Sequence, residues 1–160
     1  MGYGVVDSIG SDILHIASGT LAAKRSLPVG KRLSLIHSEL FTLIENWKPD
    51  VIAIEAPFVP GLQFGENRAA TSIKSSIAVG QAQAVALMAA AANDIPSFSY
   101  APTEVKYAVT HYGRGSKEQV SAMIQLIIGI DTGSLPTDET DALAVALCHI
   151  RSEKLRRLTE

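Results

Sequence analysis

The chain has 160 residues, of which 47% are hydrophobic and 19% are charged, and its formal net charge is −2. This composition excludes an intrinsically disordered chain, and the length fits one domain, residues 1–160, with a buried core. The slightly acidic balance excludes a protein that coats nucleic acid nonspecifically. A metal-dependent nucleic-acid enzyme stays open, because carboxylates that hold metal ions offset local basic patches.

Three features of the sequence indicate a cytoplasmic protein. The one cysteine, Cys148, cannot form a disulfide within the chain, which suits a reducing compartment. Residues 1–10 lack the basic region and apolar run of a signal peptide. Residues 77–92 are weakly polar, but they are too short and too polar to cross a bilayer. We therefore expect no membrane segment.

The first third of the chain predicts an antiparallel meander followed by a helix. Residues 3–7 and 12–20 have the patterns of strands around a turn, and residues 21–26 are a candidate third strand. Residues 27–30 break the chain with Pro and Gly. Residues 31–47 then carry apolar side chains at helical spacing, which predicts a helix with one face in the core.

A short apolar run over residues 51–54, between turn signals, predicts a strand buried on both faces. Glu55 follows directly, at the edge where open α/β sheets usually place their chemistry. Taken alone, Glu55 has a simpler interpretation as an exposed charge of the following loop, since acids at strand ends are common.

The remaining elements alternate between helix and strand. A long Ala-rich helix with Gly80 inside it is predicted first, and its small side chains suit close packing on a sheet or against a second copy of the chain. Ser116 and Gln119 form a capping-box pattern at a later helix start. The predicted elements are a helix over 69–93, a strand over 97–100, helices over 103–112 and 117–128, a loop over 129–136, a helix over 138–151 and a fraying tail over 151–160. This order predicts a mixed α/β sheet with helices on both faces.

Two further acids lie at the start of the last predicted helix. Asp138 and Asp141 are three residues apart, so they lie on one helix face, which continues through Val145 and Cys148. For either acid alone, favourable interaction with the helix N-terminus is the simpler explanation. Together with Glu55 at a strand end, the pair makes a carboxylate site for a hard cation such as Mg²⁺ credible.

Several blocks of the sequence resemble, in the same order, the RuvC family of Holliday-junction resolvases, which have the RNase H-like fold. Residues 138–149, with the pattern Asp-x-x-Asp-Ala-Leu-Ala, resemble the family's C-terminal signature, and residues 53–58 resemble its second acidic strand. Residues 80–87 resemble its Gly-Gln-Ala-Arg helix, and residues 104–120 its basic helix-loop-helix segment. Each block is weak alone, but the ordered set covers nearly the whole chain.

The resemblance implies a structure-specific endodeoxyribonuclease that nicks four-way junction DNA symmetrically in recombination and repair. Glu55, Asp138 and Asp141 would hold two metal ions, Mg²⁺ or Mn²⁺, for two-metal phosphodiester hydrolysis. A homodimer would place two such sites to match the two-fold symmetry of the junction. The resemblance also implies a branch-migration helicase complex as a partner. The sequence contains no glycine-rich phosphate loop of the kind that an ATP-hydrolysing relative of the same fold would need, and this disfavours that alternative.

The resemblance also implies residues that contact DNA. Lys106 and Lys117 match basic residues that hold the backbone near the scissile phosphate, and their alternative is a solvated helix surface. Phe58 matches an aromatic residue that would stack on an unpaired base near the junction centre. An ordinary Phe that anchors a loop explains it equally well. Arg68 and Arg114 are candidates for phosphate contacts from their loop positions.

One part of the family pattern has no counterpart in this sequence. The family begins with a strand that ends in Gly-Ile-Asp-Pro-Gly and supplies the first metal ligand, whereas residues 1–6 match the family just after that strand. Asp7 lies at the far end of the next strand and is no substitute. We expect that the native protein begins upstream of Met1 or, as the alternative, that the chain is a noncatalytic junction-binding relative. For the 160-residue chain we expect weak or no nuclease activity, because the first metal ligand has no counterpart. We also expect poor stability, because the strands next to the missing one would lack a partner.

Overall fold

The computed structural model describes residues 1–56, 68–113 and 115–159, and it describes the side chains of the long helix α2 from Ser76 onward. Within these residues, no helix combines the length and the apolar character that crossing a membrane requires. The elements follow one another as β1 (Gly2–Ile9), β2 (Asp12–Thr20), α1 (Val29–Trp47), β3 (Ile52–Glu55), α2 (Arg68–Ala92), β4 (Ser97–Tyr100), α3 (Pro102–Thr110), α4 (Lys117–Ile128), the 3-10 turn η1 (Thr132–Ser134) and α5 (Thr137–Thr159).

The strands form one antiparallel pair and one parallel pair. β1 and β2 pair from Gly2 opposite Thr20 to Ile9 opposite Asp12, with an irregularity after Val5. β3 and β4 run parallel, and Glu55 at the end of β3 lies opposite Tyr100 at the end of β4. The predicted order of antiparallel strands before parallel strands is confirmed. Among the described strands, however, the two pairs are separate sheets, whereas the sequence predicts one mixed sheet.

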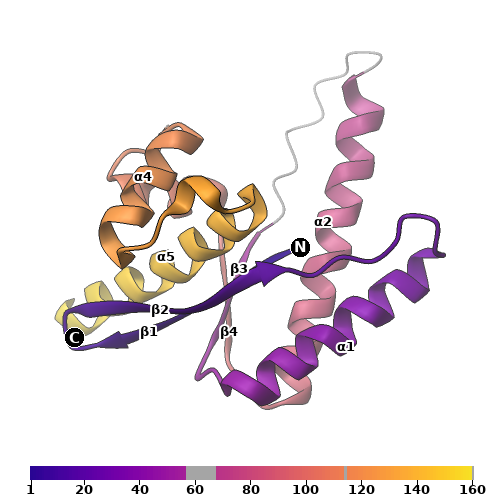
Figure 1. Cartoon of the computed structure of the whole chain (residues 1–160), viewed down its shortest axis with the longest axis horizontal. Helices are drawn as coiled ribbons and strands as arrows, with labels where there is room; N and C mark the ends of the chain where they lie inside the picture. The colour runs from indigo at the N-terminus through magenta and orange to yellow at the C-terminus, as the bar shows by residue number, and fades with distance from the viewer. Residues whose placement is uncertain (57–67, 114, 160) are drawn as a thin grey trace.

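Helix α5 connects the two sheets, because it packs against β1, β3 and β4 (Figure 1). Its Leu143 and Leu147 are fully buried. Gly4 lets β1 approach this helix closely, since a Cβ atom at that position would lie 2.7 Å from Leu143 Cδ2. Helices α3 and α4 add Val109 and Ile124, which are also fully buried, to the same core. The hydrophobic core is therefore centred on α5.

Helices α1 and α2 pack against each other, and α2 also contacts β3 and β4 (Figure 1). The parallel pair thus lies between α2 and α5, as predicted for a sheet with helices on both faces. The inward face of α2 is a stripe of small side chains, and it consists of Val85, Ala86, Ala89 and Ala90, all buried. The Ala-rich composition therefore serves close packing within the chain.

Two local predictions about strands are wrong. Residues 21–26 do not form a third strand. The backbone N–H and carbonyl of Leu21 form hydrogen bonds with Met1, of 2.8 and 3.0 Å, and the chain then turns toward α1. β3 is not buried on both faces. Its Ile52, Ala53 and Ile54 are half-buried and Glu55 is exposed, because β3 has a partner strand on one side only among the described residues.

The charged tail was predicted to fray, and this is also wrong, because α5 continues to Thr159. Arg151 donates a hydrogen bond to the carbonyl oxygen of Ala108 at the end of α3. Arg156 bonds Glu153 at 2.6 Å, and its guanidinium lies 5.7 Å from the ring centroid of Phe98 on β4. The charged side chains thus attach the helix to its neighbours, and basic groups in its last turn complement the helix dipole.

Candidate active site

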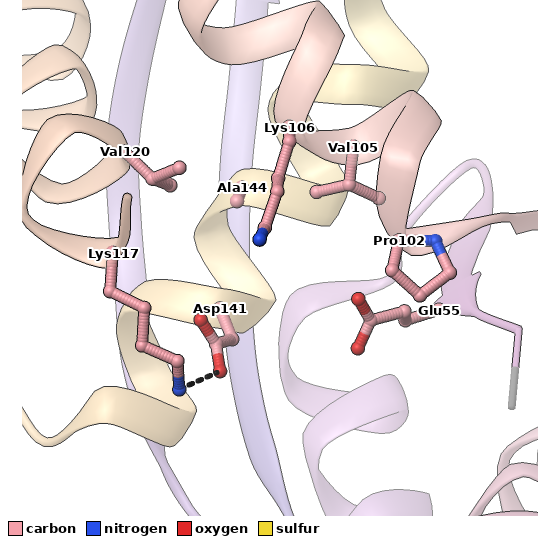
Figure 2. A pocket seen from close by; sticks show the side chains of 8 residues that line it. All are labelled: Glu55, Pro102, Val105, Lys106, Lys117, Val120, Asp141 and Ala144. Carbon is pink, nitrogen blue, oxygen red and sulfur yellow. Dashed lines mark ion pairs between the residues drawn. The ribbon is translucent and has the colours of Figure 1, made fainter. Parts of the chain in front are cut away.

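A shallow pocket of about 240 Å³ opens where the end of β3 meets α3, α4 and α5 (Figure 2). Its lining combines two carboxylates, two ammonium groups and an apolar wall, contributed by Glu55, Pro102, Val105, Lys106, Lys117, Val120, Asp141 and Ala144. Four of the residues predicted to act in the site, from four different elements, therefore share one pocket. They are Glu55, Lys106, Lys117 and Asp141.

The two carboxylates reach the pocket from β3 and α5. Side chains alternate along a strand, so Glu55 points to the same face as Ala53, which packs against the core around α5. Asp141 lies near the start of α5, and Ala144 follows one turn later on the same face of that helix. Figure 2 shows the Glu55 side chain directed into the pocket and the Asp141 carboxylate turned toward Lys117.

The two lysines enter the same opening from α3 and α4 (Figure 2). The predicted capping box fixes the start of α4: Ser116 Oγ accepts from the Gln119 backbone N–H at 3.3 Å, and Gln119 Oε1 accepts from the Ser116 N–H at 2.8 Å. Lys117, the next residue, places its Nζ 3.7 Å from Asp141 Oδ2. Both side chains of this ion pair are at least half exposed, so the pair adds little to the stability of the fold. Lys117 can therefore leave Asp141 and form an ion pair with an incoming anion.

The surroundings of Glu55 raise the pKa of its carboxyl group. Partial burial has the largest effect, and the negative charge of Asp141 raises the pKa further, while the positive charges of Lys117 and Lys106 lower it. A divalent cation between the two carboxylates would favour their ionised forms. The described pocket offers carboxylate oxygens and neither thiol nor imidazole, which is the donor set that Mg²⁺ and Mn²⁺ prefer. The residues present therefore fit such an ion.

Asp138 lies one helical turn before Asp141 but does not line this pocket. Its Oδ2 atom is 3.7 Å from the main-chain nitrogen of Met1, and its side chain is 62% exposed. Within the part of the chain that the structure describes, no group of three or more acidic, His or Cys side chains could hold a metal ion. The structure brings Glu55 and Asp141 together, and the three-carboxylate site stays a prediction.

Three of the predicted DNA contacts cannot be located. Phe58 and Arg114 lie outside the described residues, and Arg68 begins α2 with its side chain outside the described part. Their assigned roles stay predictions.

Two features of the site region are not predicted by the sequence. The apolar wall is the first, because helical spacing identifies Val105 and Val120 as buried without indicating that they border the carboxylates. The second is a buried hydrogen bond of 2.8 Å between the Tyr100 hydroxyl and His149 Nδ1, next to the strand that carries Glu55. Only the tertiary structure brings these two residues together.

Replacing Lys117 by Met is expected to raise the pKa of Glu55. Lys117 favours the ionised carboxylate, so its loss moves the ionisation of Glu55 to higher pH. A carbon-13 NMR titration of the Glu55 carboxyl group measures this shift. Lys31→Met removes the same charge from exposed Lys31 on α1 and serves as the matched control. An unchanged Glu55 titration in Lys117→Met would contradict the interaction.

Comparisons with known proteins give a consistent result. The family described as "Crossover junction endodeoxyribonuclease RuvC" matches residues 1–149. Relatives with that name are 36% identical in Thermotoga petrophila, over 99% of this chain and 90% of the relative, and 36% identical in Thermomicrobium roseum, over 99% and 93%. The structure of Thermus thermophilus RuvC in complex with Holliday junction substrate matches with a TM-score of 0.80 at 27% identity, over 96% of this chain and 88% of that one. A second structure of Thermus thermophilus RuvC gives a TM-score of 0.77.

Proposed function

This chain belongs to the RuvC family of crossover junction endodeoxyribonucleases, and we propose that it nicks four-way junction DNA symmetrically in recombination and repair. The similarity to the solved structures confirms the predicted RNase H-like fold. The observation that supports the function best is the pocket itself. Glu55 and Asp141 meet there with Lys106 and Lys117, which is the combination that phosphodiester hydrolysis of DNA needs.

Nucleases of this family depend on metal ions in general, and our proposal is two ions per site, Mg²⁺ or Mn²⁺. Glu55 and Asp141 would hold them, with Asp138 as the third carboxylate. When bound, such ions supply an activated water molecule and stabilise charge on the leaving 3′ oxygen. Lys106 and Lys117 draw the scissile phosphate into the opening, where Lys117 exchanges its exposed pairing with Asp141 for a phosphate oxygen.

The substrate would be held by further contacts and by a second copy of the chain. Phe58 would stack on an unpaired base, and Arg68 and Arg114 would contact phosphates. A homodimer is supported by exposed apolar side chains on α2, where Ile77, Val79 and Met88 are 55%, 47% and 64% exposed. A branch-migration helicase partner and a cytoplasmic location stay predictions.

One observation favours a second candidate, a noncatalytic protein that grips four-way junctions. Asp138 does not line the pocket, and the described residues hold no cluster of three metal-binding side chains. The two lysines could still bind a DNA backbone without a complete metal site.

A junction assay separates the two candidates. The purified chain is mixed with an end-labelled four-way junction or a linear duplex of the same sequence, with EDTA, Mg²⁺ or Mn²⁺. The nuclease is expected to bind the junction in preference to the duplex, which is seen as slower migration of the junction on a native gel. With metal, it is expected to produce paired nicks at symmetric positions. Preferential binding without nicks supports the noncatalytic candidate. Equal binding of junction and duplex contradicts both.

A further inference from the structure

A buried polar pair joins β4 to α5 and lies outside the set of residues that line the pocket. Tyr100 and His149 are each 8% exposed, and the phenol oxygen lies 2.8 Å from His149 Nδ1. The ring of Phe98, on the same strand, lies 4.8 Å from the imidazole ring. Burial lowers the pKa of His149 and raises that of Tyr100, which favours the neutral form of each group, and a neutral phenol can donate to a neutral imidazole.

This hydrogen bond connects α5, which carries Asp141, to β4, the strand that pairs with the one carrying Glu55. Tyr100 lies opposite Glu55 in the parallel pair, and its carbonyl oxygen accepts the N–H of Ala56 at 2.8 Å. Its position along the sheet is thus tied to that of Glu55. His149 lies about two turns beyond Asp141 on α5, and a helix transmits a displacement along its axis as a rigid element. A shift of the hydrogen bond would therefore move Asp141 relative to Glu55.

The apolar contacts between α5 and the parallel pair, which involve Ala53 and Phe98, do not fix a position as sharply. Apolar packing is non-directional, so a small slide or rotation of α5 exchanges similar contacts. The Tyr100–His149 bond has a defined length and direction. Breaking it would remove this partner from the buried His149 Nδ1 atom, while the Tyr100 hydroxyl also interacts with the Ser152 side chain. Within the described chain, no buried side-chain polar atom lacks a hydrogen bond, which is the arrangement that the pair helps to maintain.

We propose that Tyr100 and His149 are positioning residues that set the separation of the Glu55 and Asp141 carboxylates, and thereby the affinity of the pocket for a divalent cation. This inference rests on the proposed function in one respect, that these two carboxylates hold the metal. Neither Tyr100 nor His149 touches the substrate or the ion in this proposal, because His149 acts through α5 and Tyr100 acts through the pairing of β4 with the strand that carries Glu55.

The test measures Mn²⁺ binding to the full chain without DNA. Electron paramagnetic resonance of the free ion monitors the binding. Tyr100→Phe and His149→Leu each remove one half of the bond and are expected to weaken Mn²⁺ binding about tenfold or more, the scale seen for partners of metal ligands. His149→Asn retains a hydrogen-bond acceptor near the Nδ1 position and is expected to bind Mn²⁺ as the wild type does.

Phe98→Leu is the matched control, because it alters a neighbour of the same imidazole ring without touching the hydrogen bond. Thermal unfolding is recorded for every variant, and binding is compared where all are folded. The proposal is overturned if Tyr100→Phe binds Mn²⁺ like the wild type, or if Phe98→Leu weakens binding equally. A wild type that binds no Mn²⁺ also overturns it. If the wild type binds Mn²⁺ but does not bind four-way junctions in preference to duplex DNA, the proposed function is overturned and the positioning role is not.

Discussion

Replacing Asp141 by Asn is expected to reduce junction cleavage at least about a hundredfold. Loss of a residue that hydrogen-bonds to a metal ligand typically reduces metal affinity or activity about 10- to 100-fold, and loss of a carboxylate ligand itself should reduce them at least as much. The change also releases Lys117 from its 3.7 Å ion pair and removes a negative charge from the pocket. Binding of the junction in EDTA is therefore expected to be retained or strengthened.

Single-turnover assays, with the chain in excess over labelled junction, can record this loss even where cleavage is slow. Glu139→Gln is the control, because Glu139 lies two residues earlier on α5 and does not line the pocket. It makes the same change in charge and is expected to leave the rate unchanged. If Asp141→Asn and the wild type cleave at equal rates, Asp141 does not belong to the catalytic site.

Replacing Leu143 by Ala is expected to destabilise the protein by about 3 kcal/mol, within the range of about 2–5 kcal/mol for buried Leu-to-Ala changes. Leu143 is fully buried in the core, where it also meets β1 at Gly4. The neighbouring backbone can collapse only partly into the space left behind. For a chain of this size the loss corresponds to a fall in melting temperature of roughly 10 °C.

Urea unfolding followed by circular dichroism measures the free energy, and the chain offers a matched comparison. Leu158 lies on the same helix and is 82% exposed, so Leu158→Ala is expected to change the free energy of unfolding by less than about 0.5 kcal/mol. Equal effects of the two substitutions would show that Leu143 does not pack as the structure describes.

Much of the fold follows from patterns that are local in the sequence. The apolar spacing of residues 31–47 and the capping pattern at Ser116 depend only on neighbours along the chain, and both elements are present as predicted. The ends of elements depend on distant partners. Arg151 and Arg156 look like a solvated tail in the sequence, and they extend α5 because they meet α3 and Phe98.

The candidate site divides in the same way. Spacing and family resemblance identify Glu55, Asp141 and the two lysines, and the structure brings all four into one pocket. A separation of three residues shows that Asp138 and Asp141 share a helix face, but it cannot show which of them meets Glu55. That depends on how α5 lies against β1 and β3, and no local pattern in the sequence records this arrangement.

The position of α5 between the two sheets also has a consequence for how the chain folds. β1 packs against α5, while every other described helix and strand lies between them in sequence. Contacts between such distant segments have a high entropic cost of loop closure and slow the folding of a domain. During synthesis, the hairpin of β1 and β2 leaves the ribosome long before the helix that buries its apolar face. We therefore expect the core to close only after α5 has been made, and the nascent hairpin to depend on chaperones until then.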